Sequence, residues 1–197
     1  MSHTKKLLRK KFTLARKQLS VQQQTLASQQ MCALIAKAAD FTQAKTVALY
    51  WPCNNEISPL PLVDIAYAAN KACYLPVMAP NGKRQLLFAS YHPLQQLHCN
   101  KVGIPEPDLT IAKTIAIQQL DIILLPVVAF DRSGGRLGTG GGYYDASLAI
   151  LREQTNNVVI PKLIGLGYAI QEVAQLPLDS WDYKLDAIIT EQQYIAI

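Results

Sequence analysis

Glycines are concentrated in one stretch of the chain, beside a cation and a carboxylate. Six of the ten glycines lie within SGGRLGTGGGYYD, residues 133–145. Consecutive glycines can turn several backbone N–H groups toward one point. Arg136 adds a forked cation, Thr139 adds a hydroxyl, and Asp145 adds a carboxylate suited to a hard cation that bridges to phosphates. The stretch therefore indicates a site for a nucleoside triphosphate with Mg²⁺.

The standard phosphate-binding motifs do not match this stretch. A P-loop needs a lysine after its last glycine, and none follows here. The dinucleotide fingerprint GxGxxG fails because Tyr143 stands where its third glycine belongs. A plain strand-to-helix turn with two core tyrosines is the alternative reading, although Arg136 and Asp145 exceed what a turn requires.

Positive charge is concentrated at the N-terminus. Residues 1–39 contain no Asp or Glu, whereas the rest of the chain is mildly acidic. The cations of this segment are Lys5, Lys6, Arg9, Lys10, Lys11, Arg16, Lys17 and Lys37. In a helix, Lys5, Arg9 and Arg16 lie along one edge of an apolar stripe. Such a segment is a solvated helix face, a nucleic-acid-binding arm, or a source of cations for a phosphate.

Helical and strand patterns alternate along the chain. We expect a helix over residues 4–19 and a second helix over 21–39, with Ser20 as its N-cap. Further on we expect strands at 46–51, 71–78, 85–91, 120–130, 162–169 and 186–190, helices at 59–70 and from Tyr143 to Glu153, and a long loop over 92–108.

This pattern predicts an α/β fold in a single domain over residues 1–197. We expect three layers, with an open, largely parallel sheet flanked by helices and an N-terminal helical pair. Ligands of such sheets bind beyond the C-terminal ends of the strands. The glycine-rich stretch follows one such end, and residues 51–56 follow another.

Cysteine usage and hydropathy indicate a cytoplasmic protein. The four cysteines form no CxxC pair, which favours reduced thiols over disulfides or zinc. No run of 18 apolar residues predicts a transmembrane helix, and the Lys-rich start does not resemble a signal peptide.

The stretch FDRSGGRLGTGGGYYD, residues 130–145, resembles the signature of the 5-formyltetrahydrofolate cyclo-ligase family, also called 5,10-methenyltetrahydrofolate synthetases. The resemblance extends over nearly the whole chain. It includes a basic first helix with Lys5 and Arg9 four apart, an NEI tripeptide after the first strand, an IPEP stretch, and an Asp before the last strand.

This resemblance implies a set of nucleotide-binding residues. Arg136, Lys5 and Arg9 would act as the catalytic cations. The residues expected to bind ATP are Lys5, Lys6, Leu7, Leu8, Arg9, Arg136, Leu137, Gly138, Thr139, Gly140, Gly141, Gly142, Tyr143 and Tyr144.

It also implies folate and metal sites. Glu56 matches the family's folate-binding glutamate, and Trp51 matches a substrate-contacting position. Thr139, Gly140, Gly141, Gly142 and Tyr143 would also lie near the folate. Asp145 and Asp182 resemble the two Mg²⁺ ligands, with Asp186 left as a competitor for the second role.

The implied reaction is the ATP-dependent conversion of 5-formyltetrahydrofolate to 5,10-methenyltetrahydrofolate, with release of ADP and phosphate. The formyl oxygen would be phosphorylated, and N10 would then close the ring. We expect a monomer with small-molecule substrates and Mg²⁺, and no nucleic-acid or membrane partner. Two alternatives stay open, another ATP- or sugar-phosphate-binding α/β enzyme and an RNA-binding protein that uses the basic helix.

The chain departs from the family pattern at three positions. Val102 stands where an aromatic residue often precedes GIPEP, Ala146 where an Arg often follows GYYD, and Trp181 where the family often has His. None of the three is a residue to which we assign chemistry.

Overall fold

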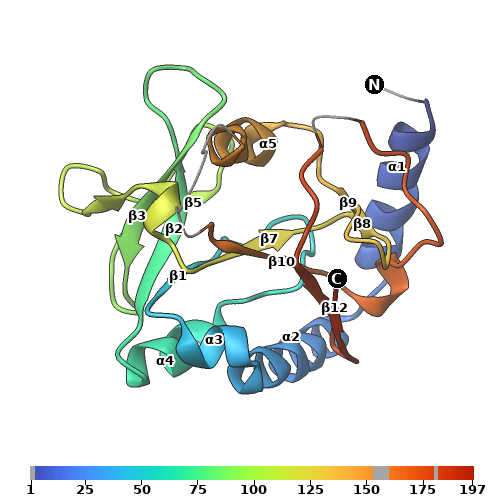
Figure 1. Ribbon diagram of the computed structural model, residues 1–197, viewed down its shortest axis with the longest axis horizontal. Helices are drawn as coiled ribbons and strands as arrows, with labels where there is room; N and C mark the ends of the chain where they lie inside the picture. The colour runs from blue at the N-terminus through green and yellow to red at the C-terminus, as the bar shows by residue number, and fades with distance from the viewer. Residues whose placement is uncertain (1–2, 153–159, 180–181) are drawn as a thin grey trace.

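A mostly parallel sheet of eight strands forms the centre of the computed structural model, which describes residues 3–152, 160–179 and 182–197 (Figure 1). The spatial order is β12 (Tyr194–Ala196), β11 (Ala187–Ile189), β10 (Lys162–Leu166), β7 (Ile122–Pro126), β1 (Thr46–Ala48), β2 (Ala72–Met78), β3 (Leu86–Tyr91) and β6 (Thr114–Ile115). The five strands from β11 to β2 are parallel, and β12, β3 and β6 add antiparallel pairs at the two edges.

Helices cover both faces of this sheet, as the sequence predicts. They are α1 (His3–Lys17), α2 (Val21–Lys37), α3 (Ala39–Gln43), α4 (Pro61–Ala68) and α5 (Tyr143–Leu148), with short 3₁₀ turns η1 (Ile117–Gln119), η2 (Ala149–Leu151) and η3 (Ala169–Gln171). The α2, α3 and α4 helices lie on one face, and α5 lies on the other (Figure 1). The predicted three-layer α/β fold is therefore confirmed.

The central strands are apolar throughout because both of their faces are buried. In β7, Ile122 and Leu124 pack into the core beneath α2 and α4, whereas Ile123 and Leu125 pack into the core beneath α5. This alternation explains the near-continuous apolar run in the sequence. It also fixes the register of β7, because a one-residue slip would exchange the two sets of side chains.

The strand order changes direction between β1 and β7, which are parallel neighbours. From β1 the chain continues through α4 to β2 on one side, and it later returns through β7 on the other side of β1. In α/β sheets a ligand crevice opens at such a switch point, outside the carboxyl ends of the strands. The segments that follow β1 and β7 include Glu56 and the glycine-rich stretch.

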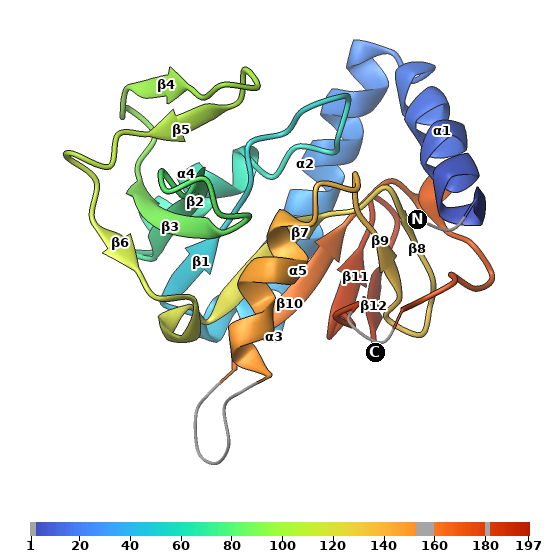
Figure 2. The same cartoon turned by 90° about the horizontal axis from the view of Figure 1, so that it is seen from above.

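The two N-terminal helices pack against different partners. Ser20 caps α2 with a reciprocal capping box to Gln23, as its sequence position predicts. The α1 helix lies beside a hairpin of β8 (Ala129–Phe130) and β9 (Arg136–Leu137), as Figure 2 shows. Phe12 of α1 is buried there together with Leu137 of β9.

Two predictions about the chain between strands were wrong in detail. The stretch 92–108 is not a structureless loop, because β4 (Leu97–Cys99) and β5 (Pro105–Pro107) pair as an antiparallel ribbon. The run 120–130 is not one strand, because the chain leaves the sheet after Pro126 and pairs again as β8. In both cases the chain turns back and pairs with a strand a few residues further on, β4 with β5 and β8 with β9, and the hydrophobic pattern alone does not show these turns.

The predicted helix from Tyr143 to Glu153 is shorter than expected. The α-helical part ends at Leu148, and one 3₁₀ turn continues it to Leu151. Glu153 lies outside the described residues.

The four cysteines are free thiols. Cys32 and Cys73 are buried, Cys53 is half-buried and Cys99 is exposed. In the described ranges, no helix has the length and hydropathy needed to cross a lipid bilayer.

Candidate active site

A tight turn after β8 aims Arg136 at the site. The Asp131 carboxylate accepts hydrogen bonds from the backbone N–H groups of Ser133, Gly135 and Leu176 at 2.8–3.0 Å. Burial opposes its ionisation, but these bonds and the Ser133 hydroxyl outweigh burial and lower the pKa of Asp131. Gly134 completes the turn with a φ of 85°. Two of the six clustered glycines therefore shape the hairpin and are separate from the loop that follows.

Arg136 and Asp145 close the glycine loop on itself. Arg136, which is 7% exposed, pairs through its guanidinium with the Asp145 carboxylate in the first turn of α5. Gly142 precedes this helix with a φ of 72°. Ser147 anchors the helix to the sheet, since its Oγ accepts from the N–H of Leu86 at 2.8 Å.

Three cations of α1 reach three different segments of the site. Lys5 Nζ lies 2.7 Å from carboxylate oxygens of both Asp179 and Asp182. Arg9 donates from Nε to the carbonyl oxygen of Gly138 at 2.8 Å. The Arg16 side chain is buried, and its Nη1 lies 3.9 Å from Glu56 Oε1. The edge that the helical projection singled out therefore faces the protein interior.

Glu56 is held in a turn at the C-terminal end of β1. Asn54 and Asn55 adopt left-handed φ values of 50° and 59°, which bring the Glu56 carboxylate back toward Cys53. Its Oε2 accepts from the Cys53 N–H at 3.1 Å. Burial raises the pKa of Glu56, while the bond from Cys53 and the charge of Arg16 oppose that rise.

Tyr144 connects the part of the site expected to bind the nucleotide with the part expected to bind the folate. Burial raises the pKa of its phenol, Glu56 raises it further, and Arg136 lowers it, so the ring lies within electrostatic reach of both groups. Among the described residues, buried side-chain atoms without a hydrogen-bond partner occur only on Arg16, Arg136, Tyr144 and Tyr168. Such atoms mark a place where a ligand or water belongs.

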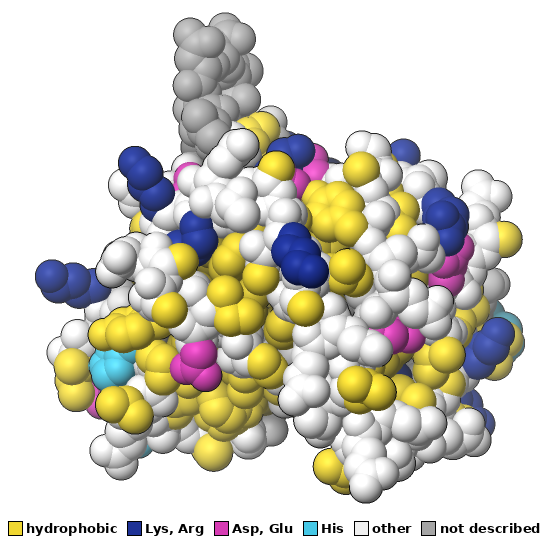
Figure 3. Space-filling model, turned by 90° about the horizontal axis from the view of Figure 1, so that it is seen from below, with side chains coloured by type: hydrophobic (Ala, Val, Ile, Leu, Met, Phe, Trp, Pro, Cys, Tyr) yellow, Lys and Arg dark blue, Asp and Glu magenta, His cyan; other side chains and the backbone are white. Residues whose placement is uncertain are grey.

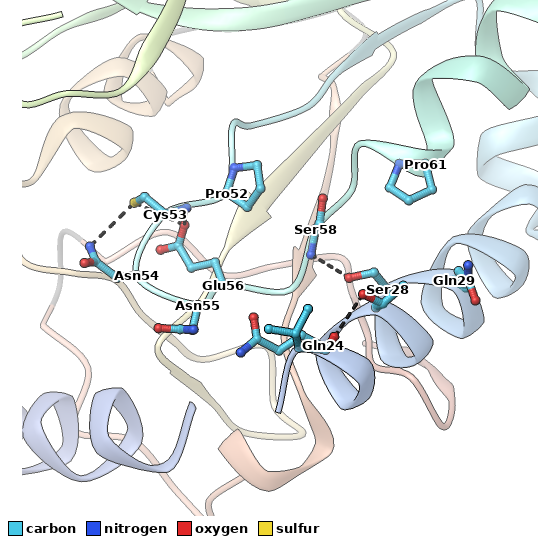
Figure 4. Close-up of a pocket in the computed structure, with 12 residues that line it drawn as sticks. Gln24, Ser28, Gln29, Pro52, Cys53, Asn54, Asn55, Glu56, Ser58 and Pro61 are labelled. Atoms are coloured by element: carbon cyan, nitrogen blue, oxygen red, sulfur yellow. Dashed lines mark hydrogen bonds between the residues drawn. The ribbon is translucent and has the colours of Figure 1, made fainter. Parts of the chain in front are cut away.

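A pocket of about 440 Å³ opens beside this cluster, between α2 and residues 52–61 (Figure 4). Gln24, Ser28 and Gln29 line one wall, and Glu56 belongs to the opposite wall. Ser28 Oγ accepts from the Ser58 N–H at 3.0 Å and ties the walls together. The pocket gives a ligand of folate-ring size access to the segment that carries Glu56.

The chain matches the model of the 5-formyltetrahydrofolate cyclo-ligase family over residues 1–191. It belongs to this family.

Curated relatives and solved structures agree with this assignment. The chain is 37% identical over 182 residues to the 5-formyltetrahydrofolate cyclo-ligase of Haemophilus influenzae, covering 92% of this chain and 95% of that protein. It is 34% identical over 175 residues to the one of Escherichia coli K12, covering 89% of this chain and 93% of that protein. The 5,10-methenyltetrahydrofolate synthetase structure from Aquifex aeolicus superposes with a TM-score of 0.81 at 30% identity, over 98% of this chain and 92% of that one. The chain is accordingly an enzyme of the cyclo-ligase family.

Not every position carried over from the family lies in the interior of the site. Lys6 and Leu7 are exposed on α1, and Leu8 packs against the cluster around Phe12. Thr139 is exposed in the glycine loop, whereas Trp51 is half-buried against the core. Their family-derived roles stay predictions.

The two candidates for the second metal-ligand role lie in different parts of the fold. Asp182 is near the site, where Lys5 and Arg136 help to lower its pKa against the effect of burial. Asp186 precedes β11 at the other end of the strands, and its Oδ2 accepts from the Leu163 N–H at 2.8 Å. This geometry favours Asp182 over Asp186 for a role at the site.

Sequence reasoning missed three partners in this site. Asp179 shares Lys5 with Asp182, and Tyr168 supplies a buried hydroxyl near Arg16 and Glu56. The pairing of Arg16 with Glu56 was also missed. The inward face of α1 was the available signal for Arg16, but nothing local in the sequence identifies a partner forty residues away.

Proposed function

We propose that this enzyme converts 5-formyltetrahydrofolate to 5,10-methenyltetrahydrofolate at the expense of ATP, with release of ADP and phosphate. The observation that carries the proposal is that Glu56 and Arg136 of the glycine-rich stretch both lie within electrostatic reach of the half-buried Tyr144, whose buried hydroxyl has no partner among the described residues. A phosphate site and a pterin-binding carboxylate in one crevice suit a reaction that transfers a phosphoryl group from ATP to the folate.

ATP would bind with its phosphates on the glycine loop. Arg136 and the loop N–H groups would meet the anionic oxygens, and Lys5 and Arg9 of α1 would add charge from the opposite side. Support comes from the bond between Arg9 and Gly138, which already joins α1 to the loop. Phosphoryl transfer depends on positioning and charge stabilisation, so these cations suffice without a protein nucleophile.

The formyl oxygen is a poor leaving group, so it is phosphorylated before the ring closes. The formyl oxygen attacks the γ-phosphorus, the bond from that phosphorus to the ADP oxygen breaks, and an imidate-like phosphate forms. N10 then attacks the formyl carbon and loses its proton, the carbon–oxygen bond breaks, and phosphate leaves. Arg136, Lys5 and Arg9 would stabilise charge on the phosphoryl oxygens during both steps.

The donors near the glycine loop fit Mg²⁺. Asp145 pairs directly with Arg136, and the charge of Arg136 also acts on Asp182, so both carboxylates face the same region. Within the described ranges no group of three protein ligands is assembled for a metal. A nucleotide-bound Mg²⁺ needs only one or two carboxylates besides phosphates and water. The ion would neutralise phosphate charge, and Asp145 and Asp182 would hold it.

Glu56 would orient the pterin. A carboxylate accepts hydrogen bonds from both the ring N–H and the 2-amino group, and the neighbouring pocket offers room for the ring. Trp51, three residues beyond β1, would offer a flat apolar surface to the substrate.

The RNA-binding alternative is less well supported by the arrangement of charge. Lys5 and Arg16 of α1 are buried beside carboxylates, so these two cations are not available to a nucleic acid. On the face covered by α2, α3 and α4, Lys and Arg side chains are spread among apolar and uncharged ones (Figure 3). Nucleic-acid sites instead gather cations into a patch or stripe.

The test is a spectroscopic assay of the purified enzyme. With 5-formyltetrahydrofolate, Mg²⁺ and ATP, the near-ultraviolet band of the methenyl product should grow, and it should not grow without ATP. Arg136→Ala and Glu56→Gln should abolish it, while Arg132→Ala, an exposed neighbour paired with Glu172, should retain it. A folded, ATP-binding enzyme that yields no band would refute the proposal and favour another acceptor.

A further inference from the structure

The cations of α1 form one row that serves both halves of the site. Lys5 and Arg16 are eleven residues apart, which places them about 20° apart around the helix and about 16 Å apart along it. Arg9 lies between them on nearly the same line. Lys5 and Arg9 contact the segments assigned to the nucleotide, whereas Arg16 reaches the folate segment. Nothing in the nucleotide half explains the position of Arg16.

Arg16 is an unusual residue to bury. Its side chain is 1% exposed, and neither Nε nor Nη1 has a hydrogen-bond partner among the described residues. Leaving a buried charge without compensation is costly, so such a group persists where a function or a partner requires it. The carboxylate nearest to it is that of Glu56, at 3.9 Å from Nη1.

The two oxygens of Glu56 have different surroundings. Oε2 accepts from the Cys53 N–H and faces the Cys53 thiol at 3.4 Å. Oε1 faces Arg16 and has no hydrogen bond from the described residues. The carboxylate is thus anchored through one oxygen and lies beside a cation that opposes the rise in its pKa caused by burial, while the other oxygen stays available to a ligand.

From this arrangement we propose that Arg16 is a positioning residue for the pterin, which keeps Glu56 ionised and oriented with Oε1 free to accept from the ring. This inference rests on the proposed function, since it assumes that Glu56 binds the pterin. Arg16 acts through Glu56 and does not touch the reacting atoms. It is the folate-side counterpart of Lys5 and Arg9 on the same helix.

The surroundings of Glu56 determine how its ionisation should respond. The groups that face it are Arg16 from α1, Tyr50 and Cys53 from the segment after β1, Tyr144 from α5 and Tyr168 after β10. Arg16 is the cation of this set, whereas the phenols and the thiol are neutral near pH 7, since their ordinary pKa values lie above 7 and burial raises them further. Removing Arg16 should therefore let Glu56 take up a proton at a higher pH.

The experiment compares Arg16→Gln and Arg16→Lys with Lys17→Gln, an exposed cation on the next position of α1. For Arg16→Gln we expect a KM for 5-formyltetrahydrofolate raised by about tenfold or more, the size of a lost charged interaction, with the KM for ATP nearly unchanged. The acidic limb of the pH profile of kcat/KM for the folate should move to higher pH. Arg16→Lys should restore part of both effects, and Lys17→Gln should behave as wild type.

A double mutant separates positioning from a purely structural role. On a Glu56→Gln background, Arg16→Gln should change folate binding little, because the group it positions is already neutral. An unshifted pH limb in Arg16→Gln, equal changes in both KM values, or a fully additive double mutant would overturn the proposal.

Binding without ATP distinguishes this failure from failure of the proposed function. Wild type that binds 5-formyltetrahydrofolate but forms no methenyl product would refute the reaction, and the Arg16 comparison would then be read from the dissociation constants and their pH dependence. Wild type that does not bind the folate at all would refute both.

Discussion

Lys5 Nζ lies 2.7 Å from Oδ2 of Asp182, so an ion pair joins the first helix to a segment 177 residues later. The resemblance to the family assigns the lysine to phosphates and the aspartate to Mg²⁺. When Mg²⁺ and ATP bind, Lys5 would exchange a carboxylate oxygen for a phosphate oxygen, and Asp182 would exchange the ammonium for the metal. The pair thus holds both groups in position before the substrates arrive.

The magnesium requirement should distinguish Asp182 from Asp186. In Asp182→Ala, the Mg²⁺ concentration needed for half-maximal activity should rise by about tenfold or more, because one of the two carboxylates proposed to hold the ion is lost. In Asp186→Ala, that concentration should stay at the wild-type value, while the free energy of unfolding falls by about 1–2 kcal/mol through the lost bond to Leu163. Titrating Mg²⁺ in the absorbance assay and measuring urea unfolding provide both numbers. The reverse pattern would assign the metal role to Asp186.

Lys5 should matter to nucleotide binding, whereas an exposed cation of the same helix should not. Lys5→Met should raise the KM for ATP by about tenfold or more, since the variant lacks the buried cation proposed to contact the phosphates. Lys10→Met is the matched control, because Lys10 is exposed on α1 and is not among the residues expected to bind ATP. Initial rates over a range of ATP concentrations test this expectation. Equal effects of the two substitutions would contradict it.

The sequence predicts the layers well because local patterns specify them. Because β7 is buried on both faces, it appears in the sequence as a run of apolar residues. Ser20 is a residue type that favours the N-cap position, and in the structure it caps α2 together with Gln23. Residues that act through partners distant in the sequence are harder to predict. Arg16 could be placed on an inward edge, but its pairing with Glu56 depends on how the β1 turn folds back. The roles of the nucleotide, folate and metal residues stay predictions.

Asp131 should be the main stabiliser of the turn that carries Arg136. Asp131→Ala removes four hydrogen bonds to backbone N–H groups and the Ser133 hydroxyl, and should cost about 2–4 kcal/mol of unfolding free energy at pH 7. Because folding lowers the pKa of this carboxyl, its contribution is complete above about pH 4 and is lost as pH falls through the folded value. Urea unfolding of both proteins at pH 7 and at pH 3 measures the difference. A difference that grows toward acidic pH would contradict this assignment.

Two glycines on either side of Arg136 should differ in their tolerance of a methyl group. A Cβ on Gly135 would lie 2.6 Å from Asp131 Oδ2, whereas one on Gly138 would meet only Arg136 Nη1 at an ordinary 3.8 Å. Gly135→Ala should therefore lower the melting temperature by several degrees, about what a loss of 1–3 kcal/mol produces in a domain of this size, and Gly138→Ala should leave it nearly unchanged. Thermal unfolding of the two variants is the check. Equal melting temperatures would show that the turn has room to relax.

Coupling between ATP cleavage and ring closure would establish the proposed reaction. In one reaction with 5-formyltetrahydrofolate, Mg²⁺ and ATP, methenyl product is followed by its near-ultraviolet absorbance while ADP is quantified. We expect one ADP for each methenyl product formed, and neither product when either substrate is omitted. Methenyl product formed without ATP, or ADP released without the folate at the same rate, would contradict it.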